Sequence, residues 1–122
     1  MQESGFIDFI LSQSKAPVTV SKTAILFVEE NNDNPQITHL HCVGGITHVV
    51  DGLYTDIRDS LPKFVPSQSK SNEQPRVAIH DWNVSYIEKG SDDTAIVYFT
   101  EPGVSISLLD SYEDIIAKFH AL

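Results

Sequence analysis

The fold is decided by two stretches of the sequence, Pro17-Val-Thr-Val-Ser-Lys-Thr-Ala-Ile-Leu-Phe-Val-Glu29 and Arg76-Val-Ala-Ile-His-Asp-Trp-Asn-Val-Ser-Tyr-Ile-Glu88. Both end in glutamate, and they align at a spacing of 59 positions, from 17 to 76. The apolar residues that match are Val18 with Val77, Val20 with Ile79, Ile25 with Val84, Phe27 with Tyr86 and Val28 with Ile87. Such an internal repeat predicts that one supersecondary unit accounts for both halves.

The correspondence continues along the chain at a spacing of 58 positions. Among the matching pairs are Gly45 with Gly103, Val50 with Leu108, Tyr54 with Tyr112 and Ile57 with Ile115. We attribute the change in spacing to a one-residue deletion in the polar loop between the aligned segments. The sequence therefore predicts two related units, about 17–64 and 76–122, joined by a polar surface linker over 65–75.

Each unit has the signals of two strands, a hairpin and a closing helix. The hairpin turns are predicted at Gly44-Gly45 and at Pro102-Gly103, because these pairs favour tight-turn backbone angles. In the second unit, Asp110 followed by Glu113 predicts a capping box at the start of an amphipathic helix.

The apolar segment before the repeats, Phe6-Ile-Asp-Phe-Ile-Leu11, is predicted to form a short helix capped by Ser4. The complete prediction is an α+β fold in a single domain spanning residues 1–122. It consists of an antiparallel, strongly twisted sheet from two tandem β-hairpin–helix units, with helices against one side, plus the short N-terminal helix.

Charge restricts the partners of the chain. Seventeen Asp and Glu residues outnumber eight Lys and Arg residues, which gives a net charge of −9. Phosphate backbones are bound by clustered cations that release counterions, and the cations here are scattered. We therefore expect no nucleic-acid partner and no membrane partner, and an acidic surface suited to a basic protein.

Cysteine usage and hydropathy predict a cytoplasmic location. Cys42 is the only cysteine, so no intrachain disulfide can form, as is typical of proteins in a reducing compartment. No apolar run has the length of a membrane-spanning helix. The N-terminus lacks the basic residues of a signal peptide.

The order of elements, with Arg76, His80 and Asn83 in the second unit, is similar in layout to LytTR-type DNA-binding domains. This resemblance covers most of the chain, and it implies DNA contact through a basic, serine-containing stretch that opens the second unit. The stretch here reads Arg76-Val-Ala-Ile-His-Asp-Trp-Asn-Val84, with Asp81 where the family would need positive charge. No functional residue is carried over, since a shared architecture does not imply a shared activity.

A candidate metal site lies in Thr38-His39-Leu40-His41-Cys42-Val43-Gly44-Gly45-Ile46-Thr47-His48. With Gly44-Gly45 as a two-residue turn, His41 faces His48 across the hairpin, and His39 shares their face. His39, His41 and His48 would then present a histidine triad to zinc, whose open fourth position supports hydrolysis or hydration. Cys42 falls on the opposite face and is expected to be a small buried side chain.

The alternative is a metal-free face of half-buried, hydrogen-bonded histidines. At the spacing of 58 positions, the three histidines correspond to Val97, Phe99 and Ile106, which are core-type residues. A one-residue slip of the turn would also separate the histidines.

The chain has no complete catalytic signature, phosphate loop or basic patch. We therefore expect a non-enzymatic regulatory or protein-interaction module, for instance an inhibitor or immunity-type protein whose acidic surface covers a basic partner. Homodimer formation is a further expected interaction. The alternatives are a metal-dependent enzyme or metal sensor that uses the histidine triad, and a LytTR-like DNA-binding regulator.

Overall fold

The computed structural model describes residues 5–122, which form ten strands and two α-helices. In β4 (Ile37–Cys42), every second side chain is buried and those between are half-exposed, as expected where one face of a strand enters a core. The other strands are β1 (Phe6–Ile10), β2 (Pro17–Ser21), β3 (Ile25–Glu30), β5 (Ile46–Asp51), β6 (Phe64–Gln68), β7 (Arg76–His80), β8 (Val84–Lys89), β9 (Thr94–Phe99) and β10 (Ser105–Ser111). The helices are α1 (Tyr54–Ser60) and α2 (Tyr112–His120), and the short 3-10 turns are η1 (Lys22–Ala24), η2 (Val43–Gly45) and η3 (Asp81–Asn83).

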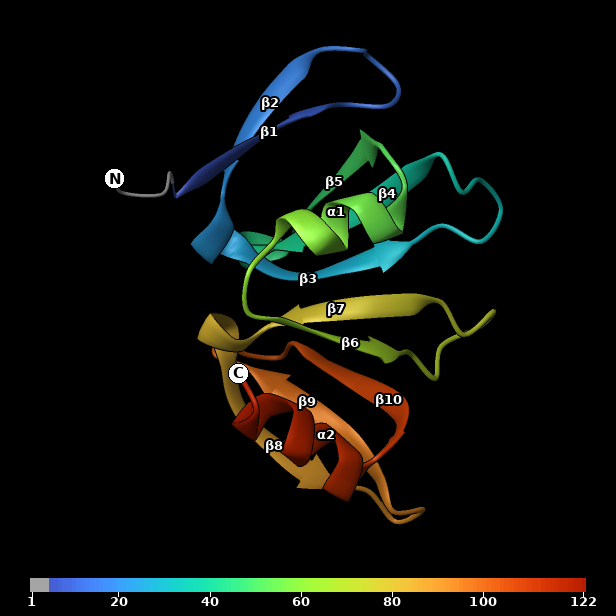
Figure 1. Cartoon of the computed structure of the whole chain (residues 1–122), viewed down its shortest axis with the longest axis vertical. Helices are drawn as coiled ribbons and strands as arrows, with labels where there is room; N and C mark the ends of the chain where they lie inside the picture. The colour runs from blue at the N-terminus through green and yellow to red at the C-terminus, as the bar shows by residue number, and fades with distance from the viewer. Residues whose placement is uncertain (1–4) are drawn as a thin grey trace.

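The strands form three antiparallel sheets, with the orders β1-β2, β5-β4-β3-β7-β6 and β10-β9-β8. Figure 1 shows the β1-β2 hairpin at one end of the long axis and the three-stranded sheet with α2 at the other. The predicted α+β class is confirmed, with three sheets in place of one. The middle sheet contains strands from both halves of the chain, because β3 pairs with β7.

The predicted N-terminal helix is wrong, because residues 6–10 form strand β1 and pair with β2. Ile7 and Phe9 face the first core, and the alternate residues Phe6, Asp8 and Ile10 are exposed, so the burial pattern has the period of a strand. Ser4, predicted to cap this helix, lies outside the described residues.

The predicted linker over 65–75 is also wrong in its first part. Residues 64–68 form β6, which pairs with β7 from Phe64↔His80 to Gln68↔Arg76. Pro66 within it fits an edge strand, where one row of backbone N–H groups has no partner strand. Only the segment after β6 is a loop.

The predicted capping box of the last helix is replaced by a different cap. Ser111 is the N-cap of α2, and its side chain accepts a hydrogen bond from the backbone N–H of Asp114 at 3.1 Å. Asp110 instead accepts hydrogen bonds from Ser67 at 2.8 Å and from Lys118 at 3.0 Å. These bonds fasten α2 to β6 and so extend the second half to residue 64.

The two halves of the described chain have the same order of elements. In each, a hairpin (β1-β2 or β6-β7) precedes a three-stranded meander (β3-β5 or β8-β10) and a helix. The register shifts at equivalent positions, between Ile25 and Phe27 on β3 and between Val84 and Tyr86 on β8. Isolated bridges also recur 58 positions apart, Leu11↔Val50 and Ser69↔Leu108.

The β3-β7 pair joins the halves, because its alternate side chains enter two different cores. Val28 and Ala78 belong to the first core, with the β1-β2 hairpin and α1, while Phe27 and Ile79 belong to the second, with β8–β10 and α2. Each core therefore needs residues from both halves.

His80 is a buried titratable group at this junction. Its ring is stacked on Phe64 with centroids 4.5 Å apart, and its Nδ1 has no hydrogen-bond partner. Burial lowers the pKa of His80 from its usual 6.5, against opposing effects of Asp81 and of a hydrogen bond with the backbone of Ile25. The neutral imidazole is thus the form that the fold favours.

We predict that acidification destabilises the wild-type protein more than the His80→Leu variant. Because the folded-state pKa lies below the unfolded-state value of about 6.5, the unfolded chain takes up the proton first, and stability declines as the pH falls through that value. Urea unfolding between about pH 7.5 and pH 5.5, where carboxyl groups remain largely ionised, measures this difference. His120→Leu, at an exposed position, is the control and keeps the wild-type slope. Equal slopes for all three proteins would contradict the prediction.

Candidate functional site

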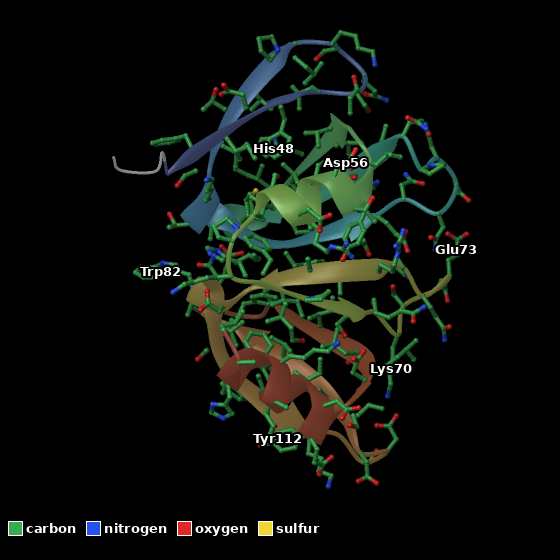
Figure 2. The ribbon with its side chains drawn as sticks, viewed as in Figure 1. His48, Asp56, Lys70, Glu73, Trp82 and Tyr112 are labelled. Atoms are coloured by element: carbon green, nitrogen blue, oxygen red, sulfur yellow. The ribbon has the colours of Figure 1, made fainter. Side chains whose placement is uncertain are left out.

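The predicted His41–His48 pairing is wrong, because the turn between β4 and β5 is longer than two residues. Cys42 pairs with Ile46, so that the turn consists of residues 43–45, in which Gly44 and Gly45 both have positive φ, 78° and 73°. His41 then lies opposite Thr47, and His48 lies opposite Leu40. His48 is therefore on the opposite face from His39 and His41, between the sheet and the β1-β2 hairpin (Figure 2).

Glu29 occupies the third position beside the two remaining histidines. It lies directly opposite His39 in the β3-β4 pair, and its Oε1 is 2.9 Å from Nε2 of His41. Each of these three residues offers a ligand atom, and the three atoms lie within 4.8 Å of one another. The sequence showed Glu29 only as the last aligned residue of a strand, and the pairing of β3 with β4 brings it to the histidines.

Neighbouring side chains orient the two imidazoles. The His41 ring is stacked on Phe27 with centroids 4.3 Å apart, and Thr47 Oγ1 lies 3.5 Å from its Nδ1. The Asn31 amide donates from Nδ2 to Nε2 of His39 at 3.1 Å. These contacts orient both rings, and the hydroxyl oxygen of Thr47 is the type of acceptor that fixes the second ring N–H of a metal-binding imidazole.

The face that bears His39 and His41 is not a core face in the second half. Ile96 and Tyr98 occupy the matching positions on β9, because Tyr86↔Tyr98 repeats Phe27↔His41. Both are half-exposed, so the predicted match of His39 and His41 to Val97 and Phe99 is wrong. The β8-β9 loop is two residues shorter than the β3-β4 loop, 90–93 against 31–36, and this shifts the register by one further position.

Two imidazoles and one carboxylate form a nitrogen and oxygen donor set that suits zinc and other borderline divalent ions. The three residues come from adjacent strands of one sheet, and all are partly accessible to solvent. Three protein ligands leave coordination positions open for water or another small molecule. Cys42 does not join them, because it is buried on the opposite face, where burial raises the pKa of its thiol to about 11.

A second feature is found where η1, η2, η3 and the β9-β10 turn (100–104) lie at the same ends of their strands. Exposed apolar side chains are concentrated there, and Trp82 is 70% exposed and projects from the molecule (Figure 2). We name this region the turn surface. It comprises Val43, Ile46, Trp82 and Tyr86.

Hydrogen bonds connect the four turns beneath this surface. The buried Asn83 side chain donates from Nδ2 to the carbonyls of Thr23 at 2.8 Å and Ile25 at 2.9 Å. The backbone N–H of Thr100 donates to the carbonyl of Asn83 at 2.8 Å, and Glu101 accepts a hydrogen bond from the N–H of Gly44. The turn surface therefore rests on a preorganised support.

The β9-β10 turn separates two hollows in this region, and Glu101 lines both of them. Tyr86 and Tyr98 line one hollow, with their rings stacked at a centroid distance of 4.4 Å. Ile46 and Phe27 line the other. The carboxylate of Glu101 thus lies between two hollows that are lined partly by apolar side chains.

Most Lys and Arg side chains form ion pairs with carboxylates of the same chain. Six of the eight Lys and Arg residues form ion pairs: Lys15–Asp51, Arg58–Asp59, Lys70–Asp92, Arg76–Glu30, Lys89–Glu113 and Lys118–Asp110. The remaining excess of Asp and Glu residues gives the surface its negative charge.

No protein-family model matches the chain, and no curated protein or solved structure is significantly similar to it. Neither helix of the described part has the length and apolar character that crossing a bilayer requires. The fold and the site define a small acidic α+β domain with two similar halves, an apolar turn surface on hydrogen-bonded turns, and a two-histidine, one-glutamate cluster.

We predict that Asn83→Ala destabilises the protein by about 1–3 kcal/mol, because it leaves the carbonyls of Thr23 and Ile25 without their donor. Urea unfolding monitored by circular dichroism measures the change in unfolding free energy. Asn72→Ala, at an exposed loop position, is the matched control and has little effect. A loss no greater than that of the control would show that the amide does not hold the turns together.

Proposed function

We propose that this protein is a non-enzymatic interaction module that binds a basic protein partner through the turn surface. The observation that carries the proposal is the gathering of exposed apolar side chains, from η2, β5, η3 and β8, on turns that are hydrogen-bonded to one another. Exposed apolar groups with polar surroundings are characteristic of protein-interaction sites.

The residue types support this proposal. Tryptophan and tyrosine are enriched among the residues that contribute most to protein–protein affinity, and Trp82 and Tyr86 are 70% and 54% exposed. Asp81 and Glu101 place carboxylates beside them, and the net charge is −9. A partner with an apolar centre and a basic rim would complement both features.

The same charges argue against a phosphate backbone as the ligand. DNA-binding surfaces carry Lys and Arg residues that neutralise phosphates, whereas Trp82 is followed by Asn83 and preceded by Asp81. The LytTR-like layout therefore stays a prediction about architecture.

We predict that Trp82→Ala weakens binding of the basic partner by roughly tenfold or more, because it removes a large exposed anchor. Immobilised wild-type and variant proteins are compared as baits for a lysate of the source cells. Quantitative mass spectrometry identifies proteins retained by the wild type and released by salt. The dissociation constant is then measured with the purified partner at several salt concentrations.

The matched control is Tyr112→Ala, which removes an aromatic ring at a distance from Trp82 (Figure 2). It is expected to bind the partner as the wild type does. Equal retention of every basic protein by the wild type and Trp82→Ala would contradict the proposal. Salt-sensitive retention of duplex DNA by the wild type would favour a nucleic-acid partner instead.

A second candidate function, binding of a divalent metal, is supported by the geometry of Glu29, His39 and His41. Their ligand atoms lie within 4.8 Å of one another, and Phe27, Thr47 and Asn31 orient the imidazoles. A metal ion would replace the direct contact between Nε2 of His41 and Oε1 of Glu29. The function would be that of a metal sensor or a metal-assisted hydrolase.

We predict that zinc titrated into the purified protein binds with a stoichiometry of about one per chain, with three protein ligands. His41→Ala should weaken binding by at least about tenfold, because it removes one ligand. His48→Ala is the matched control and should bind as the wild type does, since His48 lies on the other face. Isothermal titration calorimetry, with elemental analysis after dialysis, measures both. Equal losses in the two variants, or no zinc bound by the wild type, would exclude this site.

A further inference from the structure

In the described part of the chain, one junction joins a meander of one half to a hairpin of the other. The outer edge of β3 pairs with β7 in the register Phe27↔Ile79, Val28↔Ala78 and Glu29↔Val77. This pairing extends the first meander by a hairpin and encloses residues of both halves.

The counterparts of these two edges lie unpaired at the ends of the molecule. Among the described strands, β8 pairs only with β9, and β2 pairs only with β1. At the spacing of 59 positions, β8 is the counterpart of β3, and β2 is the counterpart of β7. The molecule therefore presents both halves of a second junction, and Figure 1 shows that they are far apart in one chain.

Apolar side chains at these ends are more exposed than their counterparts in the internal junction. Phe27 is 9% exposed, and its counterpart Tyr86 is 54% exposed. Ile87, the counterpart of the fully buried Val28, is only partly buried.

We propose that β8 of one copy of this chain pairs with β2 of a second copy, and so repeats the internal junction between molecules. The internal register places Tyr86 opposite Val20, Ile87 opposite Thr19 and Glu88 opposite Val18 of the second copy. The contact is heterologous, since the two edges differ, and it generates a ring or a linear assembly. Strand addition of this kind supplies main-chain hydrogen bonds to an open sheet edge.

The contact between copies is weaker than the internal one. Arg76 pairs with Glu30 in the internal junction, and Asn83 donates two hydrogen bonds across it, but their counterparts are Pro17 and Ala24. Two chains of net charge −9 also repel each other. The association is therefore reversible and becomes stronger as salt screens the repulsion.

Paired cysteines test the register directly. In a variant with Thr19→Cys and Ile87→Cys, facing thiols of adjacent copies are close enough for a disulfide. Mild oxidation should give a ladder of linked chains on a non-reducing gel, about tenfold more abundant than in the control, because only aligned cysteines reach bonding geometry. Cys42 does not interfere, since it is 6% exposed.

The matched control combines Thr19→Cys with Ser107→Cys, a residue that is exposed on β10. Sedimentation of the wild-type chain should show association that rises with protein and salt concentration. Thr19→Lys, at an exposed position of β2, should abolish it by placing a charge at the edge. A monomer at all concentrations, or equal cross-linking in the two cysteine pairs, would overturn the proposal.

The salt dependence of binding distinguishes self-association from the binding of a basic protein partner. Association of copies strengthens with salt, whereas binding of a basic protein weakens with salt. Trp82→Ala should leave the cross-linked ladder unchanged, because Trp82 lies in η3, outside the β8 edge.

Discussion

The antiparallel pairing of β3 with β7 is the interaction on which the rest of the structure depends. It joins a strand of the first meander to a strand of the second hairpin, and its alternate side chains enter two separate cores. Because a strand has a period of two, one pair of strands can serve both cores without any additional element. Unfolding of either half would expose apolar residues of the other, so the two halves are expected to unfold together.

This pairing also positions both parts of the candidate site. β3 carries Glu29 to the histidines of β4, and its other neighbour, β7, leads into η3 with Trp82. Asn83 fixes η3 against η1 through two carbonyls, and Glu101 reaches η2 from the β9-β10 turn. The turn surface and the cluster of Glu29, His39 and His41 thus depend on one arrangement of strands.

Particular residues show why sequence reasoning succeeded in some places and failed in others. The alternation in β4 and β9 predicted strands because burial on one face leaves a clear pattern. The segment Phe6–Ile10 was taken for a helix, since short apolar runs are ambiguous between helix and strand until their pairing is known. Glu29 was missed as a neighbour of the histidines, because its position depends on the register between strands and not on any local signal.

The sequence by itself determined the negative charge, the α+β class and the strands of each half other than β1 and β6, because composition and side-chain period are local properties. Only the tertiary structure decided which side chains meet. The three-residue turn 43–45 moves His48 to the other face, and a β3-β4 loop two residues longer than its counterpart aligns His39 and His41 with Ile96 and Tyr98. A shift of one residue reverses the face of every side chain, and the backbone angles that set it are fixed by packing between strands that are distant in sequence.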